Sequence, residues 1–204
     1  MARIGFDLVV WDFDGVLNRN LPQETYVWAA SVAADRGYDP VGFQEVVFAS
    51  GKFAEVMCGR LDLLDVVADW LSGQGSEEEP DLFLAHWFAH EASPDDEVGR
   101  WLDQCPIRKV IGTNNEVRRT AYIAGDMGFG ARVERVFASG QVGAVKPQPG
   151  FYQAIEDWSG ARGPRILLID DNATYIAAAH RRGWNAFHFT DATRHRLPAI
   201  LGIG

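Results

Sequence analysis

The stretch that decides the fold is LVVWDFDGVLN, residues 8–18, in which an apolar run meets two aspartates separated by one phenylalanine. Residues 6–11 are rich in β-forming side chains and almost continuously apolar, which is typical of a strand covered on both faces. Asp12 and Asp14 follow where that strand ends, and Gly15 then permits a turn. Two neighbouring carboxylates repel each other unless positive charge compensates them. The stretch therefore predicts either a solvated acidic turn or a site that attracts a cation.

The second half of the chain alternates between strand-like and helix-like segments. Strands are predicted at residues 109–113, 135–139, 165–171 and 185–189, and amphipathic helical segments lie between them. Such an alternation indicates βαβ units, which build a parallel sheet covered by helices on both faces. The predicted fold class is therefore α/β, with a Rossmann-like parallel sheet flanked by helices.

Residues 19–93 interrupt this alternation after the first strand. Residues 23–37 carry apolar side chains at helical spacing and end at Gly37, and residues 40–71 and 81–92 continue the helical pattern. Ser93 is predicted to cap the next helix, with Pro94 at its first position. We therefore predict a helical cap domain of residues 19–93, inserted into a catalytic core of residues 1–18 and 94–204.

Composition and charge exclude several classes of protein. The 204 residues are 47% hydrophobic and 23% charged, as in an ordinary globular protein. The net charge of −9 argues against a nucleic-acid or membrane-surface partner, since both prefer basic patches. Cys58 and Cys105 lack the spacing of a zinc site or a disulfide framework. No apolar run reaches the roughly 20 residues of a membrane span, and no signal-peptide pattern begins the chain, so we expect a cytoplasmic protein. No pattern indicates an oligomeric state.

Polar side chains follow four of the predicted strands. In chain order they are Asp12 and Asp14, then Thr113 and Asn114, then Lys146, and finally Asp170 and Asp171. Because ligands bind beyond the carboxyl ends of parallel strands, we expect these groups to meet at one edge of the sheet. Four carboxylates favour a hard divalent cation, and Mg²⁺ beside a substrate phosphate is the natural choice. Lys146 and the Thr113 hydroxyl would then contact the phosphoryl group.

The motifs DFDGVL, TNN, VKPQPGFY and IDDNATYIAAA, taken in this order, resemble the four motifs of the haloacid dehalogenase superfamily. The helical insertion resembles the first cap type of that superfamily. The chain departs from the common pattern at Val16, where many members carry Thr, and at Asn18, where many carry Asp. Neither position does chemistry in that superfamily, so the departures concern the loop that enters the cap.

The resemblance also implies roles for the site residues. Asp12 is expected to be the nucleophile that forms an aspartyl-phosphate, and Asp14 the general acid and base, whose main-chain carbonyl also binds the metal. The expected phosphate-binding residues are Thr113, Asn114 and Lys146, and the expected Mg²⁺ ligands are Asp12, Asp14, Asp170 and Asp171. The predicted function is Mg²⁺-dependent hydrolysis of a small soluble phosphomonoester.

Several alternatives stay open. A carbon–phosphorus hydrolase of the same superfamily would need a cap lysine for a Schiff base, and Lys52 is the lysine that the cap offers. A sugar-phosphate mutase is compatible with every motif. A metal-independent dehalogenase would have no use for Asp14, because a halide leaves without a proton. A binding protein with a dead site is disfavoured since no motif residue is missing. His86 and His90 lie four residues apart, but packing or a solvated face is favoured over a shared metal.

Overall fold

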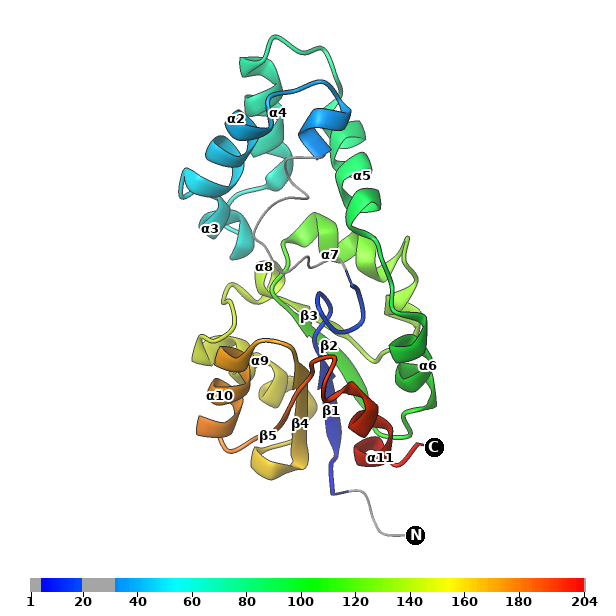
Figure 1. Cartoon of the computed structure of the whole chain (residues 1–204). Coiled ribbons are helices and arrows are strands. Elements are labelled where there is room, and N and C mark those ends of the chain that lie inside the picture. The colour runs from blue at the N-terminus through cyan, green and yellow to red at the C-terminus, as the bar shows by residue number, and fades with distance from the viewer. Residues whose placement is uncertain (1–4, 20–31, 204) are drawn as a thin grey trace.

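The computed structural model describes residues 5–19 and 32–203. Over these residues the centre of the molecule is a five-stranded parallel sheet with the order β3-β2-β1-β4-β5 (Figure 1). Its strands are β1 (Leu8–Trp11), β2 (Lys109–Thr113), β3 (Val136–Ala138), β4 (Ile166–Asp170) and β5 (Asn185–His188). The predicted α/β class with a Rossmann-like sheet is confirmed, and β1 lies at its centre.

Helices cover both faces of this sheet. The longer core helices are α6 (Asp96–Gln104), α7 (Val117–Ala124), α9 (Pro149–Ser159) and α10 (Ala173–Arg181), and the short elements are η2 (Phe129–Ala131), α8 (Ser139–Val142), η3 (Gly163–Arg165), η4 (Arg194–Arg196) and α11 (Leu197–Leu201). Val9 and Trp11 of β1 belong to an apolar cluster with α6, α7 and α11. Leu8 and Val10 belong to a second cluster with α9 and α10. Because successive strand residues point to opposite faces, this double cover explains the continuously apolar first strand.

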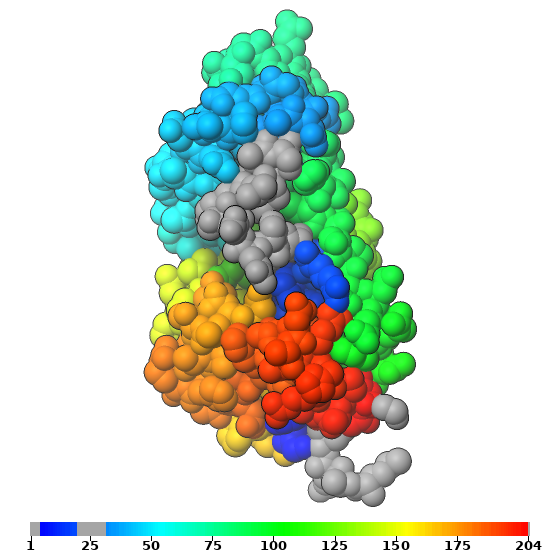
Figure 2. All heavy atoms as spheres, in the orientation of Figure 1, coloured from blue at the N-terminus to red at the C-terminus, as the bar shows by residue number. Residues whose placement is uncertain are grey.

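The remaining helices gather at one end of an elongated molecule (Figures 1 and 2). They are α2 (Pro40–Gln44), the π-helical η1 (Glu45–Ala49), α3 (Lys52–Met57), α4 (Leu63–Gly73) and α5 (Pro80–Glu91). Their buried side chains form a separate apolar cluster, in which Phe43 packs against Trp70, Phe83 and Trp87. This end of the molecule corresponds to the predicted helical cap, while its boundaries at residues 19 and 93 stay a proposal.

The first predicted cap helix, residues 23–37, lies partly outside the described residues. Residues 32–35 are helical, and Gly37 then adopts a φ of +79°. Nothing further tests the predicted start of this helix at residue 23. In the part of the chain that the structure describes, no helix is long and apolar enough to cross a membrane.

The predicted start of α6 is wrong by two residues. Asp95, and not Ser93, caps the helix, because its carboxylate accepts hydrogen bonds from the main-chain N–H groups of Glu97 and Val98. The Ser93 N–H instead donates to the side chain of Asn18 at 2.7 Å, and Pro94 forms an isolated bridge with Asn18. Residues 93 and 94 are therefore an extended connection that runs beside the segment leaving β1.

The cap and the core meet at several places, and at two of them main-chain groups come together. At the first, the chain leaving β1 lies beside the chain returning from α5: the Arg19 N–H donates to the Ser93 carbonyl at 2.7 Å. At the second, Gly59, after α3, approaches the core helix α8 so closely that a Cβ on Gly59 would lie 1.9 Å from the Gly140 carbonyl oxygen. Only glycine fits there, because its φ is also +68°.

Candidate active site

The carboxyl ends of β1, β2 and β4 open onto a cavity of about 180 Å³. Its lining consists of Asp12, Asp14, Thr113, Asn114, Lys146, Asp171, Asn172 and Tyr175. Of the site residues predicted from the sequence, only Asp170 is missing from this lining, because it is fully buried behind Lys146, with which it forms an ion pair. The structure thus brings all seven predicted side chains to one edge of the sheet.

Lys146 is a buried cation between two aspartates. Its Nζ lies 2.9 Å from Asp12 Oδ1 and 2.7 Å from Asp170 Oδ2, and the ring of Tyr175 lies 5.0 Å away. Burial by itself disfavours the ammonium, but the attraction of Asp12 and Asp170 outweighs it and raises the pKa of Lys146. The side chain therefore carries a fixed positive charge at the base of the cavity.

Three carboxylates form a group that can hold a metal ion. Oxygen atoms of Asp12, Asp170 and Asp171 all lie within 4.8 Å of one another. Burial and the negative charge of Asp170 raise the pKa of Asp12 well above its ordinary range, with Lys146 opposing them. Burial and the same neighbour raise the pKa of Asp171 to about 6. Three hard oxygen donors against one ammonium leave an excess of negative charge, which fits a divalent cation such as Mg²⁺.

The turn after Asp14 fixes the place of Asp171. Gly15 has a φ of +84°, and a Cβ on it would lie 2.2 Å from Asp171 Oδ2. The backbone of this turn therefore packs directly against the Asp171 carboxylate. On the other side, His188 Nε2 lies 2.8 Å from the main-chain oxygen of Asp171. The glycine of the DFDG motif thus has two roles: it permits the positive φ of the turn, and it leaves room for the Asp171 carboxylate.

Asp14 has different surroundings from Asp12, although only one residue separates them. Its Oδ1 accepts hydrogen bonds from Arg119 at 2.8 Å and from Asn18 at 3.1 Å, and its Oδ2 accepts one from Asn115 at 2.8 Å. The Asn115 amide also donates to the Thr113 hydroxyl at 2.8 Å. Side-chain donors thus hold the Asp14 carboxylate, and it takes no part in the acidic group. The predicted metal role of its main-chain carbonyl stays a proposal.

Asn114 holds the loop that carries Lys146. Its Oδ1 accepts a hydrogen bond from the Lys146 N–H at 2.7 Å, and its Nδ2 donates to the Lys146 carbonyl at 3.0 Å and to the Tyr175 hydroxyl at 3.1 Å. These contacts give the Asn114 side chain a positioning role, and its predicted contact with phosphate stays a proposal. Thr113 is buried and lines the cavity, as its predicted role requires.

Sequence reasoning missed Arg119, which contacts Asp14, and Glu91, which pairs with Arg119. Both are buried, and their side chains form an ion pair with each other. Arg119 lies one helical turn after Asn115, and this spacing could have indicated a residue near the site. The sequence does not, however, distinguish Arg119 from the neighbouring Arg118. In the structure Arg118 pairs with Asp62 near the surface at 2.6 Å. Glu91 ends a largely apolar helix, where a buried acid has no sequence signature.

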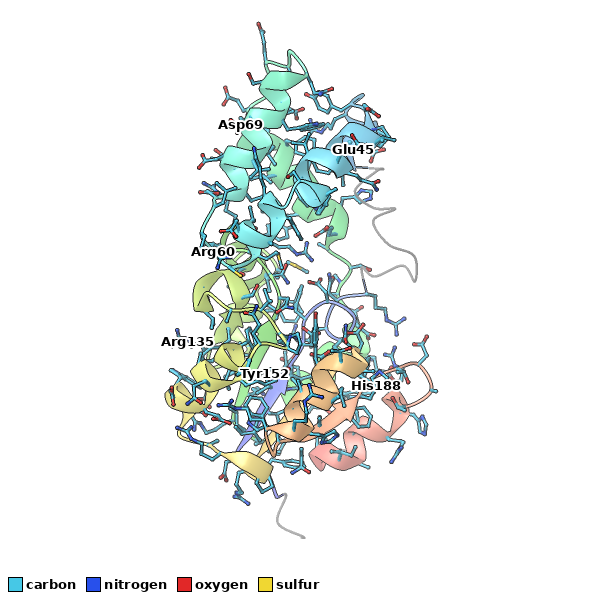
Figure 3. All side chains as sticks on the ribbon, turned by 90° about the vertical axis from the view of Figure 1, so that its left-hand side faces the viewer. Glu45, Arg60, Asp69, Arg135, Tyr152 and His188 are labelled. Atoms are coloured by element: carbon cyan, nitrogen blue, oxygen red, sulfur yellow. The ribbon has the colours of Figure 1, made fainter. Side chains whose placement is uncertain are left out.

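The charged cap residues considered from the sequence have partners away from the cavity. Lys52 lies 3.5 Å from the exposed carboxylate of Asp69, and Arg60 forms two hydrogen bonds with Glu55. Figure 3 shows Asp69 on the outer part of the cap and Arg60 at the end of the cap that is nearest to the core. Neither Lys52 nor Arg60 lines the cavity.

The histidine pair lies in the cap as well. The ring centroids of His86 and His90 are 6.2 Å apart, and each ring has a nitrogen about 4 Å from Asp35. Across residues 5–19 and 32–203, the group at the cavity is the one that brings three possible ligands close enough for a metal ion. The sequence favours packing or a solvated face for these histidines over a shared metal, and the arrangement agrees with that preference.

Comparison with known proteins gives one family and many structural relatives. The family model of the haloacid dehalogenase-like hydrolases matches residues 6–183. No match is found among curated proteins. One similar structure is a predicted HAD-like family hydrolase from Porphyromonas gingivalis, with 20% identity, 96% of each chain covered and a TM-score of 0.75.

Two further structures differ in what they bind or do. A HAD family enzyme from Bacteroides thetaiotaomicron, solved in complex with magnesium and inorganic phosphate, has 15% identity over 91% of this chain and 94% of that one, with a TM-score of 0.74. The L-2-haloacid dehalogenase from Xanthobacter autotrophicus has 18% identity over 94% and 81%, with a TM-score of 0.61. At such identities the likeness establishes the fold and leaves the reaction open.

Proposed function

Because the chain belongs to the haloacid dehalogenase-like hydrolase family, we propose that it is a Mg²⁺-dependent phosphatase, which hydrolyses a small phosphomonoester through an aspartyl-phosphate on Asp12. The observation that carries the proposal is the different setting of two carboxylates on one cavity. Asp12 lies against an ammonium and two further acids, and Asp14 is held by neutral and cationic donors. A nucleophile and a proton-transfer group need such separate settings.

The acidic group fits Mg²⁺ through its oxygen donors. We assign Asp12, Asp171 and the Asp14 carbonyl as direct ligands. Both oxygens of Asp170 already accept hydrogen bonds, from Lys146 Nζ and from the Asn172 N–H, which favours a supporting role for this residue. The bound ion would supply positive charge beside the phosphoryl oxygens.

The protein groups account for both halves of the reaction. Asp12 Oδ1 accepts hydrogen bonds from the Phe13 N–H and Lys146, which orients its carboxylate. Asp12 attacks phosphorus, the bond to the ester oxygen breaks, and the departing oxygen takes a proton from Asp14. Asp14 then takes a proton from the water that attacks the same phosphorus. The bond between phosphorus and Asp12 breaks, and phosphate leaves.

The setting of Asp14 also separates this proposal from a dehalogenase. A halide leaves without a proton, so a carboxylate held by Arg119, Asn18 and Asn115 would have no role in its departure. The carbon–phosphorus hydrolase loses support for another reason, since Lys52 pairs with Asp69 and does not line the cavity. A sugar-phosphate mutase would use the same residues and differs in its product.

The cap enters the proposal as the part that selects the substrate. We propose that residues 19–93 close over the cavity and exclude water around the phosphoryl group, on a core of residues 1–18 and 94–204. A small metabolite in the cytoplasm is the substrate that this arrangement favours. The net charge of −9 supports neither a nucleic-acid nor a membrane partner.

Turnover of p-nitrophenyl phosphate with Mg²⁺, followed by a panel of phosphorylated metabolites, tests the proposal. Released phosphate that requires both Mg²⁺ and Asp12 supports it, with Asp12→Asn as the control. A mutase would instead isomerise its substrate with no phosphate released. Absence of turnover on every compound, with Mg²⁺ bound, would contradict the proposal.

A further inference from the structure

A buried arginine connects the cap to the proposed general acid. Arg119 lies on α7 with 8% of its side chain exposed. Its NH2 group donates to Asp14 Oδ1 at 2.8 Å, its Nε donates to Asn115 Oδ1 at 2.9 Å, and its NH1 group pairs with the Glu91 carboxylate. One guanidinium thus holds three side chains from three segments of the chain.

Glu91 lies where the cap chain returns to the core. It is the last residue of α5, only 5% of it is exposed, and its Oε1 accepts a hydrogen bond from Trp87 Nε1 at 2.7 Å. Its main-chain carbonyl accepts a second one from Asn18 Nδ2 at 3.0 Å. Asn18 is fully buried and belongs to the other connection between core and cap. Glu91 is therefore fixed to both connections.

The same two side chains hold Asp14 and the end of α5. Arg119 contacts the carboxylates of both Asp14 and Glu91, and the Asn18 amide contacts Asp14 Oδ1 and the Glu91 carbonyl. Because the donors of a guanidinium point in fixed directions within one plane, a displacement of Glu91 changes the direction in which Arg119 meets Asp14. The position of α5 and the orientation of the Asp14 carboxylate are therefore not independent.

We propose that Arg119 is a positioning residue for Asp14, and that its pair with Glu91 couples the seating of the cap to proton transfer. The proposal rests on the proposed function, because it takes Asp14 as the general acid and base. Arg119 does not line the cavity and acts through Asp14. With α5 seated, the Asp14 carboxylate is held toward the cavity; with Glu91 displaced, Asp14 loses its fixed orientation.

The kinetic test uses the full-length protein with Mg²⁺ and a series of phenyl phosphates whose phenols differ in acidity. Nitrophenolate departs without a proton, whereas less acidic phenols need one from Asp14. We expect Arg119→Gln to slow Asp12 phosphorylation by phenyl phosphate roughly 10–100-fold, with a much smaller effect for p-nitrophenyl phosphate and little change in KM. With p-nitrophenyl phosphate a burst of nitrophenolate should precede slow turnover, because Asp14 also activates water in the second half.

Three further variants separate positioning from folding. Arg119→Lys keeps the positive charge and should recover part of the rate that Arg119→Gln loses. Glu91→Gln keeps the shape of the side chain and should give a weaker form of the same leaving-group dependence. Arg108→Gln removes an arginine that pairs with Glu134 within the core, away from the cap, and should leave the series unchanged. Equal losses across the series in Arg119→Gln and Arg119→Lys, or the same effect from Arg108→Gln, would overturn the proposal.

Amide hydrogen exchange tests the coupling without any substrate. The N–H groups of Arg19 and Ser93 are hydrogen-bonded at the two connections, so both should exchange faster in Arg119→Gln and Glu91→Gln and stay unchanged in Arg108→Gln. Unchanged exchange in Arg119→Gln and Glu91→Gln would overturn the coupling. A wild-type protein that hydrolyses no phosphate ester would contradict the proposed function, whereas the exchange rates would still decide whether Arg119 and Glu91 fix the cap.

Discussion

Asp12 and Asp14 lie one residue apart and belong to two different regions of the molecule. Asp12 is surrounded by groups from the core alone: a buried lysine and two aspartates at the end of β4. Asp14 is surrounded by donors from α7 and from the connection to the cap, and the arginine among them also binds the last residue of a cap helix. One region is closed within the core, and the other depends on where the cap lies.

The difference shows how one short motif can serve two chemical tasks. Excess negative charge around Asp12 suits a metal ion and a phosphoryl group, and a set of donors around Asp14 suits a carboxylate that must keep a defined direction. A change on the Asp12 side should therefore alter metal binding and phosphorylation. A change on the Asp14 side should alter proton transfer and its dependence on the cap.

The largest effect is expected at the nucleophile. Asp12→Asn should lower turnover at least about 10⁴-fold, because the amide cannot form the acyl phosphate. Folding should be largely retained, since asparagine keeps the shape of the side chain. Phosphate release and thermal unfolding measure the two effects; substantial residual activity would reject Asp12 as the nucleophile.

The next effect concerns stability. Lys146→Met removes the cation between Asp12 and Asp170 and leaves both carboxylates buried without it, which should lower the free energy of unfolding by about 3 kcal/mol in the absence of metal. Urea unfolding measures the change. Lys109→Met is the control, because Lys109 donates to main-chain carbonyls and compensates no buried acid. Equal losses in the two variants would argue against Lys146 as the counter-charge of the acidic group.

Gly15→Ala should weaken Mg²⁺ binding roughly 10–100-fold, because its Cβ would displace the Asp171 carboxylate that lies 2.2 Å away. Isothermal titration with Mg²⁺ measures the affinity. Gly128→Ala is a matched control, since Gly128 also has a positive φ and its Cβ would meet no atom within 4 Å. An unchanged affinity in Gly15→Ala would show that Asp171 is not a ligand.

The pKa of Asp171, raised to about 6 in the metal-free protein, predicts how Mg²⁺ affinity depends on pH. Above this value the carboxylate is ionised and ready to bind. Below it a proton must leave Asp171 before Mg²⁺ can bind, so the affinity should fall by at least about tenfold per pH unit, and the raised pKa of Asp12 adds to this fall. Titrations between pH 5 and 8 check the slope. An affinity that stays constant down to pH 5 would exclude Asp171 from the group that binds Mg²⁺.

The smallest effect is expected in the cap. Lys52→Met should change turnover of a phosphomonoester by less than about twofold, because an exposed ion pair with Asp69 contributes little. The same variant tests the carbon–phosphorus hydrolase alternative, because such an enzyme would lose all activity when Lys52 is replaced. Steady-state rates on phosphate and phosphonate substrates distinguish the two.

The sequence was sufficient for the sheet and for the Asp12 side of the site. Residues after strands of a parallel sheet meet by topology, so Asp12, Thr113, Lys146 and Asp171 follow from strand prediction and chemical type. The start of α6 was missed because Asp95 competes with Ser93 as the cap, and the tertiary contact of Ser93 with Asn18 decides between them.

The Asp14 side was less predictable for a related reason. Its donors come from α7, from the loop before it and from the connection that leaves β1, and no local sequence pattern records how these segments lie relative to one another. The motif assigns Asn114 to phosphate, which stays a prediction, and no sequence pattern shows that its amide also holds the Lys146 loop. Arg119 and Arg118 are adjacent and identical in type, and only packing shows that Arg119 is the buried one.

The most direct test of the central claim is to trap the phosphorylated protein. Wild-type protein is mixed with Mg²⁺ and p-nitrophenyl phosphate, quenched in acid and reduced with borohydride, which converts an acyl phosphate of aspartate to homoserine. Peptide mass spectrometry should then find homoserine at position 12 and unmodified aspartate at Asp14. In Asp12→Asn no homoserine should form. Phosphate release with no homoserine at Asp12, or with homoserine at another aspartate, would contradict the account.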